Sequence, residues 1–310
     1  MNLIGKNTYA MTDESRMSNL ISQKIKDELR QLGIEPKKSL GQNFLVNEGI
    51  YKKIVAALEI RKNDIIVEAG PGLGTLTGYL AESGAKIIAI EKDRLLIAHL
   101  KNKFKNNKNV TIIESDILKF SPATCNLKPV TFKIVGNIPY YITSHLIRNI
   151  LEDWPSPKLV VLMVQKEVAQ RICAKPPEMS LLALSVQYYA IPKIVRYVSG
   201  GNFMPSPDVD SAIIKLTPRL QVAGYRLQEK DGNKKPETWP LKPETFFRVV
   251  RAGFAGKRKQ LINNLSRDLK ISKQEIQQKL SSIDINPQRR AETLTIEEWQ
   301  KITNSLFLRD

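Results

Sequence analysis

Short β-rich runs alternate with helical stretches through the middle of this 310-residue chain, and this alternation constrains the fold more than any other feature. Each of the first four runs is followed by a Gly, an acidic residue or an Asn, and then by helical periodicity. Such alternation is typical of a parallel sheet with helices on both faces. The predicted strands are residues 65–68, 86–90, 110–115, 132–135 and 159–164.

The remaining segments complete a predicted division of the chain. Residues 194–198 and 212–216 are two more β-rich runs with no helix between them, so we expect an antiparallel pair at one edge of the sheet. Residues 1–20 are polar and predict a disordered leader, with helical periodicity beginning near Leu20. The main α/β domain is then predicted at residues 21–218, a linker or surface loop at 219–243, and a helical domain at 244–310.

The charge balance indicates a polyanionic partner. Lys and Arg number 48 against 31 for Asp and Glu, which gives a net charge of +17. A field of this sign attracts nucleic acid, although a basic enzyme with no such partner has the same composition. No apolar run is long enough to cross a bilayer, and the N-terminal residues lack the layout of a secretory signal. We therefore expect a cytoplasmic protein without membrane contact.

A Gly-rich turn follows the first predicted strand at residues 70–77. Such a turn lets a ligand contact backbone amides at the start of the next helix. The dinucleotide fingerprint requires a Gly where Thr75 stands, and here the pattern is Gly70-x-Gly72-x-Gly74. This spacing disfavours a nicotinamide enzyme and suits a ligand without a pyrophosphate, such as S-adenosylmethionine. Gly70 and Gly72 are predicted cofactor contacts.

Carboxylates follow the next two strands at the same predicted edge of the sheet. Glu91 is placed to accept both ribose hydroxyls of a bound nucleoside. Asp116 is placed to accept a hydrogen bond from an adenine, with Ile117 packing on its ring. Each carboxylate alone is compatible with a solvated loop. Together they predict a nucleoside site at the carboxyl ends of the strands.

The fourth strand ends in Asn137-Ile138-Pro139-Tyr140, which predicts the chemistry. The amino group of adenine is a poor nucleophile because its lone pair is delocalised into the ring. Two oxygen acceptors, the Asn137 side chain and the Ile138 carbonyl, would hold its N–H bonds and turn the lone pair toward a methyl donor. Pro139 fixes the backbone, and Tyr140 offers a ring for the target base. Catalysis would then be mostly positioning, on a base swung out of its stack.

These motifs and several later ones resemble the ribosomal RNA adenine dimethyltransferases of the KsgA/Dim type. The resemblance covers the chain from about residue 27 to residue 302. It rests on residues 41–45, 70–77, Glu91, Asp116, 137–140, 165–169, 203–212 and 250–259. It implies an α/β fold with a Rossmann-like class I methyltransferase sheet, mostly parallel with an antiparallel edge, plus a small C-terminal helical domain.

The resemblance also implies an activity and a partner. The expected reaction is S-adenosylmethionine-dependent dimethylation of two adjacent adenosines in a hairpin loop near the 3′ end of small-subunit (16S) rRNA. The expected substrate is an immature 30S subunit, and the expected enzyme is a monomer without a metal. Phe203 is implied as the wall of the target-base pocket that faces Tyr140. The implied cofactor contacts are Asn43, Leu45, Gly70, Glu91, Asp116 and Asn137.

An RNA-docking face and two alternative functions complete the expectations. Lys257, Arg258 and Lys259, at the start of a predicted helix, are expected to contact phosphates together with Arg251, although a solvated helix face is the simpler reading. One alternative is the large-subunit adenine methyltransferase of the macrolide-resistance type, which shares the cofactor loop and Asn-Ile-Pro-Tyr. The other is a mainly non-catalytic ribosome assembly factor.

Overall fold

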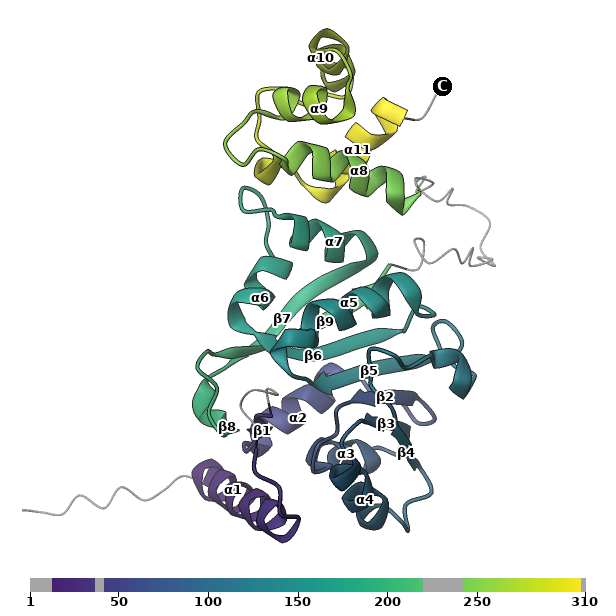
Figure 1. Cartoon of the computed structure of the whole chain (residues 1–310), viewed down its shortest axis with the longest axis vertical. Coiled ribbons are helices and arrows are strands. Elements are labelled where there is room, and N and C mark those ends of the chain that lie inside the picture. Colours follow the sequence, from purple (N-terminus) through teal and green to yellow (C-terminus); the bar gives the residue numbers. More distant parts are fainter. Residues whose placement is uncertain (1–12, 37–41, 220–241, 308–310) are drawn as a thin grey trace, which may run out of the picture. The chain divides into compact units, whose positions relative to one another are not determined.

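The computed structural model describes residues 13–36, 42–219 and 242–307, with side chains from residue 19 onward. Its largest sheet contains β2 (Ile65–Ala69), β3 (Lys86–Glu91), β4 (Val110–Glu114), β5 (Phe132–Asn137), β6 (Leu159–Gln165), β7 (Ala190–Val198) and β9 (Ser211–Pro218). The strand order is β4-β3-β2-β5-β6-β9-β7 (Figure 1). A separate two-stranded sheet pairs β1 (Phe44–Leu45) with β8 (Phe203–Met204).

The strands at the centre of the large sheet are parallel and in register. β2 pairs with β3 on one side and with β5 on the other, and Ala69 lies opposite both Ile90 and Gly136. β3 pairs with β4, and β5 pairs with β6, in the same sense. The carboxyl ends of these strands therefore meet at one edge. β9 and β7 form the antiparallel edge that the sequence predicts.

All seven predicted runs are strands. Residues 159–164 of β6, an inner strand of the sheet, are all buried, whereas β4 and β7, its two outer strands, are largely half-buried or exposed. The largest difference lies in β7, which begins at Ala190 and not at residue 194. The preceding helix ends at Tyr189, so the chain enters this strand without a loop. A sequence pattern cannot separate two elements that join directly.

The helices of the chain are α1 (Asp13–Gln31), α2 (Glu48–Ala57), α3 (Thr75–Ala81), α4 (Arg94–Lys103), α5 (Thr143–Arg148), α6 (Lys166–Ile172), α7 (Leu181–Tyr189), α8 (Pro243–Phe254), α9 (Leu261–Leu269), α10 (Lys273–Ser281) and α11 (Ile296–Phe307). Shorter helical turns are η2 (Pro122–Cys125), η3 (Tyr140–Ile142), η4 (Asn149–Asp153), η5 (Gly200–Asn202) and η6 (Ala291–Thr293). None of the helices in the described segments is both long and apolar enough to cross a membrane.

Helix α1 begins at Asp13, inside the stretch predicted as a disordered leader. Residues 1–12 lie outside the described residues. The helix packs Ile25 and Leu29 against Leu73 of the Gly-rich turn, in one small apolar cluster. Lys103 on α4 donates hydrogen bonds to Glu28 at 3.2 Å and to the Leu73 carbonyl at 2.8 Å. The N-terminal helix therefore supports the loop that follows β2.

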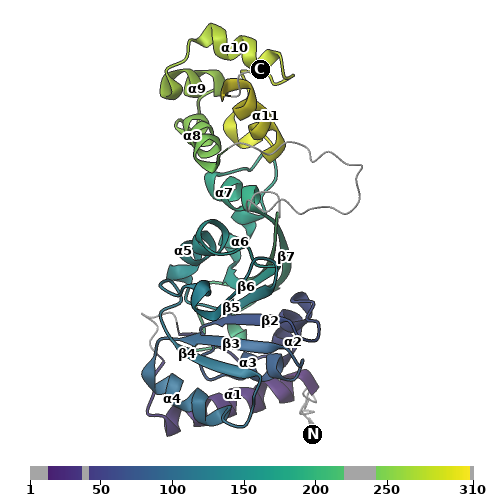
Figure 2. The same cartoon turned by 90° about the vertical axis from the view of Figure 1, so that its right-hand side faces the viewer.

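Helices α2 and α3 pack on the parallel strands. Their apolar residues, among them Ile54 and Leu80, share a buried cluster with Ile66, Ile87 and Val135 of the sheet. The Asn47 side chain caps α2 by accepting a hydrogen bond from the backbone N–H of Ile50 at 3.2 Å. Figure 2 shows β2, β3 and β4 lying side by side, with α3 next to these strands.

The chain divides into two compact units. The first contains Met1–Leu146, Pro157–Lys166 and Val195–Lys215, and the second contains Ile147–Ser156, Glu167–Ile194 and Leu216–Asp310. The core of the second unit joins α8 to α11 with α7. The division at residues 219–243 stays a prediction, since residues 220–241 lie outside the described residues.

Gly253 and Trp299 form the tightest contact in the second unit's core. The indole of Trp299 is fully buried and lies over Gly253 of α8. A Cβ at Gly253 would stand 2.1 Å from the Trp299 ring, so only Gly lets α8 and α11 approach this closely. Asn264 on α9 closes the end of α8 by donating to the carbonyls of Gly253 at 2.7 Å and Gly256 at 3.0 Å.

Candidate active site

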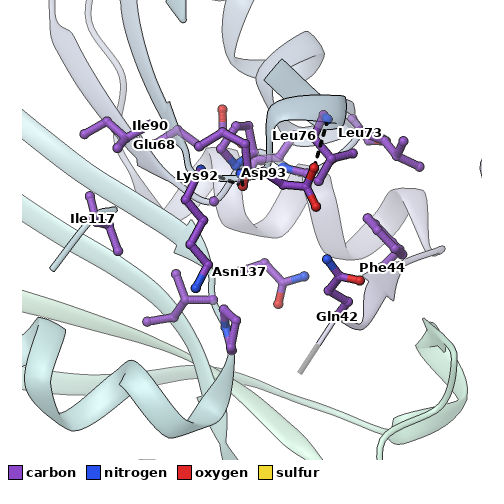
Figure 3. A pocket seen from close by; sticks show the side chains of 18 of the residues that line it. Gln42, Phe44, Glu68, Leu73, Leu76, Ile90, Lys92, Asp93, Ile117 and Asn137 are labelled. Carbon is purple, nitrogen blue, oxygen red and sulfur yellow. Dashed lines mark hydrogen bonds between the residues drawn. The ribbon is translucent and has the colours of Figure 1, made fainter. Parts of the chain in front are cut away.

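A cavity of about 410 Å³ opens at the carboxyl ends of β2, β3, β4 and β5. Its size lies in the range of about 300–1,000 Å³ that is typical of small-molecule sites. Figure 3 shows Lys92, Ile117 and Asn137 around the same space. The cavity wall contains every residue predicted to contact the cofactor, namely Asn43, Leu45, Gly70, Gly72, Glu91, Asp116, Ile117 and Asn137. The structure thus brings these residues together, and their role stays a prediction.

The Gly-rich turn follows a path that side chains would obstruct. Gly74, the residue before α3, has a φ of 75°, in the left-handed region that favours Gly. A Cβ at this position would stand 2.7 Å from the side chains of Leu100 and Phe104. Gly72 has a φ of 58°, and its backbone N–H donates to Glu91. Gly74 therefore leaves room for the side chains of Leu100 and Phe104 to pack against the turn. Gly72 brings backbone close to the cavity.

Glu91 is held at the end of β3 by backbone donors. The carboxylate accepts hydrogen bonds from the N–H groups of Lys92 at 2.8 Å, Asp93 at 3.0 Å and Gly72 at 3.3 Å. Only 8% of the residue is exposed, and this burial raises the pKa of the carboxyl while the three backbone bonds oppose the rise. The side chain is thus a fixed acceptor on the cavity wall, as its predicted role toward ribose hydroxyls requires.

Asp116 and Ile117 line the cavity from the end of β4. Asp116 Oδ1 accepts the backbone N–H of Leu118 at 3.0 Å, which fixes the carboxylate in the turn after the strand. Ile117 is buried, with 7% of its surface exposed. An apolar side chain beside an anchored acceptor suits a flat heteroaromatic ring with a polar edge.

Glu68 is a second buried carboxyl group at this cavity, and the sequence analysis missed it. It is 1% exposed, lines the cavity from within β2, and accepts a hydrogen bond from Thr77 Oγ1 at 2.7 Å. Burial raises the pKa of this carboxyl to about 8, the Thr77 bond opposes the rise, and the charge of Glu91 adds to it. The signal was an acidic residue inside the apolar run Ile65–Ala69.

Asn137 ends β5 with its amide oriented by the chain itself. Asn137 Nδ2 donates to the carbonyl of Asn43 at 3.1 Å, so Oδ1 is left as the acceptor. Ile138 and Pro139 continue the cavity wall, and Pro139 has a φ of −54° before η3 begins. Gly136 precedes the motif because a Cβ there would stand 2.9 Å from the Ala69 carbonyl. The arrangement offers a fixed side-chain oxygen where the sequence predicts it.

Tyr140 is anchored by Ser211, which the sequence analysis did not single out. Tyr140 Oη and Ser211 Oγ lie 2.6 Å apart, and Ser211 is fully buried at the start of β9. Burial raises the pKa of the Tyr140 hydroxyl, and the bond to Ser211 opposes that rise. The hydrogen bond joins residues far apart in the sequence, so no local pattern announces it. It fixes the direction of the Tyr140 ring.

Phe203, the predicted partner of Tyr140, lies in the apolar core of the first unit. It is 5% exposed and shares a cluster with Leu45, Val198 and Ile213. It is not among the described residues that line the cavity. Its assignment to a target-base wall stays a prediction.

The small β1–β8 sheet links the two sides of the site. Leu45 pairs with Phe203 across it. The Val46 N–H donates to the Asn202 carbonyl at 2.8 Å, and the side chains of Asn47 and Asn202 are joined at 2.9 Å. Because Asn43 directly precedes β1 and accepts from Asn137, this sheet ties the segment around Phe203 to the cavity wall.

The predicted phosphate contacts belong to the second unit and are exposed. Arg251 lies on α8. The sequence predicts Lys257, Arg258 and Lys259 at the start of a helix. They lie instead in the turn between α8 and α9, just before α9 begins at Leu261. Their assignment to phosphate contacts stays a prediction.

Comparisons with known proteins point to one family. The family model described as ribosomal RNA adenine dimethylase matches residues 34–307. A Dehalococcoides mccartyi (strain CBDB1) protein called ribosomal RNA small subunit methyltransferase A is 43% identical over 277 residues, 89% of this chain and 90% of that protein. Its namesake in Clostridium botulinum (strain Okra / Type B1) is 38% identical over 276 residues, 87% of this chain and 94% of that protein.

Two solved structures are similar as well. A dimethyladenosine transferase from Plasmodium falciparum is 26% identical with a TM-score of 0.68, over 84% of this chain and 95% of that one. The 23S rRNA methyltransferase ErmE is 25% identical with a TM-score of 0.68, over 85% of this chain and 99% of that one. The shared fold therefore does not distinguish the two ribosomal subunits.

Proposed function

The chain belongs to the ribosomal RNA adenine dimethylase family, and from that premise we propose that it uses S-adenosylmethionine to dimethylate two adjacent adenosines in a hairpin loop near the 3′ end of small-subunit (16S) rRNA. As a member of this family it is an rRNA adenine dimethyltransferase. The carrying observation is the Asn137 amide, which its bond to Asn43 orients with Oδ1 as an acceptor on the wall of the nucleoside-sized cavity.

The cavity suits S-adenosylmethionine, which is a nucleoside with a cationic side chain. Glu91 would accept the ribose hydroxyls, and Asp116 with Ile117 would hold the adenine. Glu91, Asp93 and Asp116 give the lining an acidic character, which matches a cation. When bound, the cofactor supplies a methyl group that its sulfonium activates for transfer.

The protein's own contribution to the reaction is positioning. Asn137 Oδ1 and the Ile138 carbonyl accept hydrogen bonds from the two N–H groups of the target amine, so the nitrogen becomes pyramidal and its lone pair is withdrawn from the π system of the ring. These oxygens also stabilise the positive charge that develops on nitrogen, and a proton then leaves to water. Tyr140, held by Ser211, gives the base a ring to stack on. No side-chain base is needed before transfer, because holding the reactants in line supplies most of the rate gain.

The small subunit is favoured over the large one as the substrate. Both curated relatives carry the small-subunit name over nearly their full lengths. The likeness to the 23S enzyme ErmE keeps large-subunit methylation as the second candidate. We propose that the enzyme acts as a monomer in the cytoplasm on an immature 30S subunit, with Arg251 and the basic turn at residues 257–259 on rRNA phosphates. The oriented Asn137 supports catalysis over a purely structural role in assembly.

Methyl transfer from labelled cofactor tests this function. Immature small subunits, mature small subunits, large subunits and naked rRNA are compared as acceptors, and primer extension locates the modified bases. We expect label only on adjacent adenosines of the immature small subunit. Label on the large subunit alone would refute the proposal in favour of the second candidate.

Asn137→Ala tests the mechanism within the same assay. Removing the oriented acceptor should lower kcat by about 100–1,000-fold, the usual cost of losing one positioned group at a developing charge. Subunit binding should not change. Asn102→Ala, at an exposed position of α4, is the matched control. Normal turnover by Asn137→Ala would show that the amino group is not held as described.

A further inference from the structure

Lys92 and Tyr141 meet at the rim of the cavity, and neither has a role in the chemistry described above. Lys92 Nζ donates to Tyr141 Oη at 3.4 Å, and this contact is exposed. Lys92 directly follows Glu91 and lines the cavity, whereas Tyr141 directly follows Tyr140 in η3. Figure 3 shows the Lys92 side chain reaching across the cavity toward the Asn137 side. The pair therefore joins the cofactor wall to the target-base wall.

Tyr141 is exposed in a way that its neighbours are not. Its exposed fraction is 55%, although Ile138 three residues earlier is only 3% exposed. A large ring left in solvent beside a binding cavity gains by covering its face with another flat group. Among the groups that an RNA brings to this edge, a base is the one with a flat face, and stacking on it is tolerant of sequence.

The positive charge of Lys92 differs from the charges of the other residues around the cavity. Of the described residues that line the cavity, Lys92 alone carries a cationic side chain, whereas Glu91, Asp93 and Asp116 are acidic. Acidic residues suit a cationic cofactor but repel the phosphates of an approaching RNA. The Lys92 ammonium at the rim offers an attractive positive charge to a phosphate of the approaching RNA. Its bond to Tyr141 uses one of three N–H donors, which leaves others for a phosphate.

We propose that Lys92 and Tyr141 bind the nucleotide next to the target adenosine, with its phosphate on the Lys92 ammonium and its base on the Tyr141 ring. This inference rests on the proposed RNA substrate. The target base must enter beside Asn137. Tyr141 directly follows Tyr140, the residue proposed to stack on that base, so the neighbouring nucleotide of the RNA lies within reach of Tyr141 and Lys92. The interior of the cavity would thus bind a cation, and its rim would bind an anion.

Equilibrium binding of the full-length protein to an RNA hairpin with two adjacent loop adenosines tests the proposal. The titration is repeated over a range of salt, starting low, where the net charge of +17 favours measurable binding. Lys92→Gln should flatten the slope of log affinity against log salt by about 0.7, the value for one single-strand phosphate. Lys86→Gln is the control. It removes an exposed Lys from the start of β3, the strand that Lys92 follows at its other end, and should leave the Lys92 contact in place.

The Tyr141 variants separate the ring from the hydroxyl. Tyr141→Ala should weaken RNA binding about tenfold, and Tyr141→Phe, which keeps the ring, should stay within about twofold of wild type. Affinity for S-adenosylmethionine, measured by calorimetry, should not change in any of these variants. RNA binding by Lys92→Gln and Tyr141→Ala that matches Lys86→Gln would overturn the proposal. So would an equal loss of cofactor affinity, which would assign the pair to the cofactor pocket.

Failure of the proposed function gives a different result. A wild-type enzyme that leaves immature small subunits unlabelled contradicts the assigned substrate, whatever the hairpin titration gives. Normal labelling by wild type, together with hairpin binding that ignores Lys92 and Tyr141, contradicts only the rim site. The two outcomes therefore cannot be confused.

Discussion

The buried carboxyl of Glu68 should make the stability of the protein depend on pH, and Glu68→Gln should remove that dependence. Burial raises the pKa of this group from 4.5 to about 8 in the folded chain. Between these two values the folded state keeps a proton that the unfolded state has lost. The wild-type free energy of unfolding should therefore fall with rising pH, at about 1.4 kcal/mol per unit at most, and level off above the folded pKa.

The magnitude follows from the two pKa values. From pH 5 to pH 8 the Glu68 contribution amounts to a loss of about 3–4 kcal/mol, with the full effect reached only above the folded pKa. Gln keeps the shape of the neutral acid and an oxygen for Thr77, so at pH 5 the variant should unfold within about 1 kcal/mol of wild type. At pH 8 it should be the more stable protein by about 3 kcal/mol.

Urea unfolding from pH 5 to pH 9 measures this difference directly. The quantity of interest is the free energy of unfolding of the variant minus that of wild type, since other groups titrate equally in both. Glu82→Gln, at an exposed position after α3, controls for the change in net charge. A difference between Glu68→Gln and wild type that is constant over the whole range would refute the assignment of a neutral, buried Glu68.

Two further substitutions test packing and the target-base wall. Gly253→Ala should destabilise the protein by about 1–3 kcal/mol or more in urea unfolding, because the new Cβ would meet Trp299 at 2.1 Å. Gly78→Ala, the same change in α3 with open space around it, should instead stabilise by about 0.5–1 kcal/mol, and equal effects would contradict the described contact. Ser211→Ala should raise KM for the RNA substrate about fivefold without changing cofactor affinity, because Tyr140 loses its anchor. Tyr140→Phe breaks the same bond, so combining the two should cost no more than one alone; additive losses would argue against the shared bond.

The sheet and the cofactor side of the cavity could be predicted because their signals are local. An apolar run followed by a Gly, Glu or Asn marks both the strand and the residue at its carboxyl end, and parallel pairing then brings these ends together. Glu91, Asp116 and Asn137 meet in this way. The beginning of α1 at Asp13 escaped prediction because the first turns of that helix carry a polar sequence like that of a loop.

Features that depend on distant contacts could not be predicted. Ser211, at the start of β9, anchors Tyr140 of η3 through a hydrogen bond, and nothing local to either residue indicates it. Phe203 is buried where β8 pairs with β1, and a pairing between segments so far apart in the sequence has no local signal. Glu68 was visible as an acid within an apolar strand, but its high pKa follows from tertiary burial.

The two-residue strands β1 and β8 predict that the two proposed substrates bind in a coupled way. One strand follows Asn43, which lines the cavity proposed for the methyl donor, and the other contains Phe203, on the side predicted for the acceptor base. A ligand that stiffens either strand lowers the entropy cost of ordering the other. Donor and RNA should therefore bind cooperatively, and thermodynamic linkage requires each to strengthen the other by the same factor. Enzyme with the methyl donor bound would thus hold an adenosine longer than enzyme without it. The demethylated donor would be released more readily once the RNA has left.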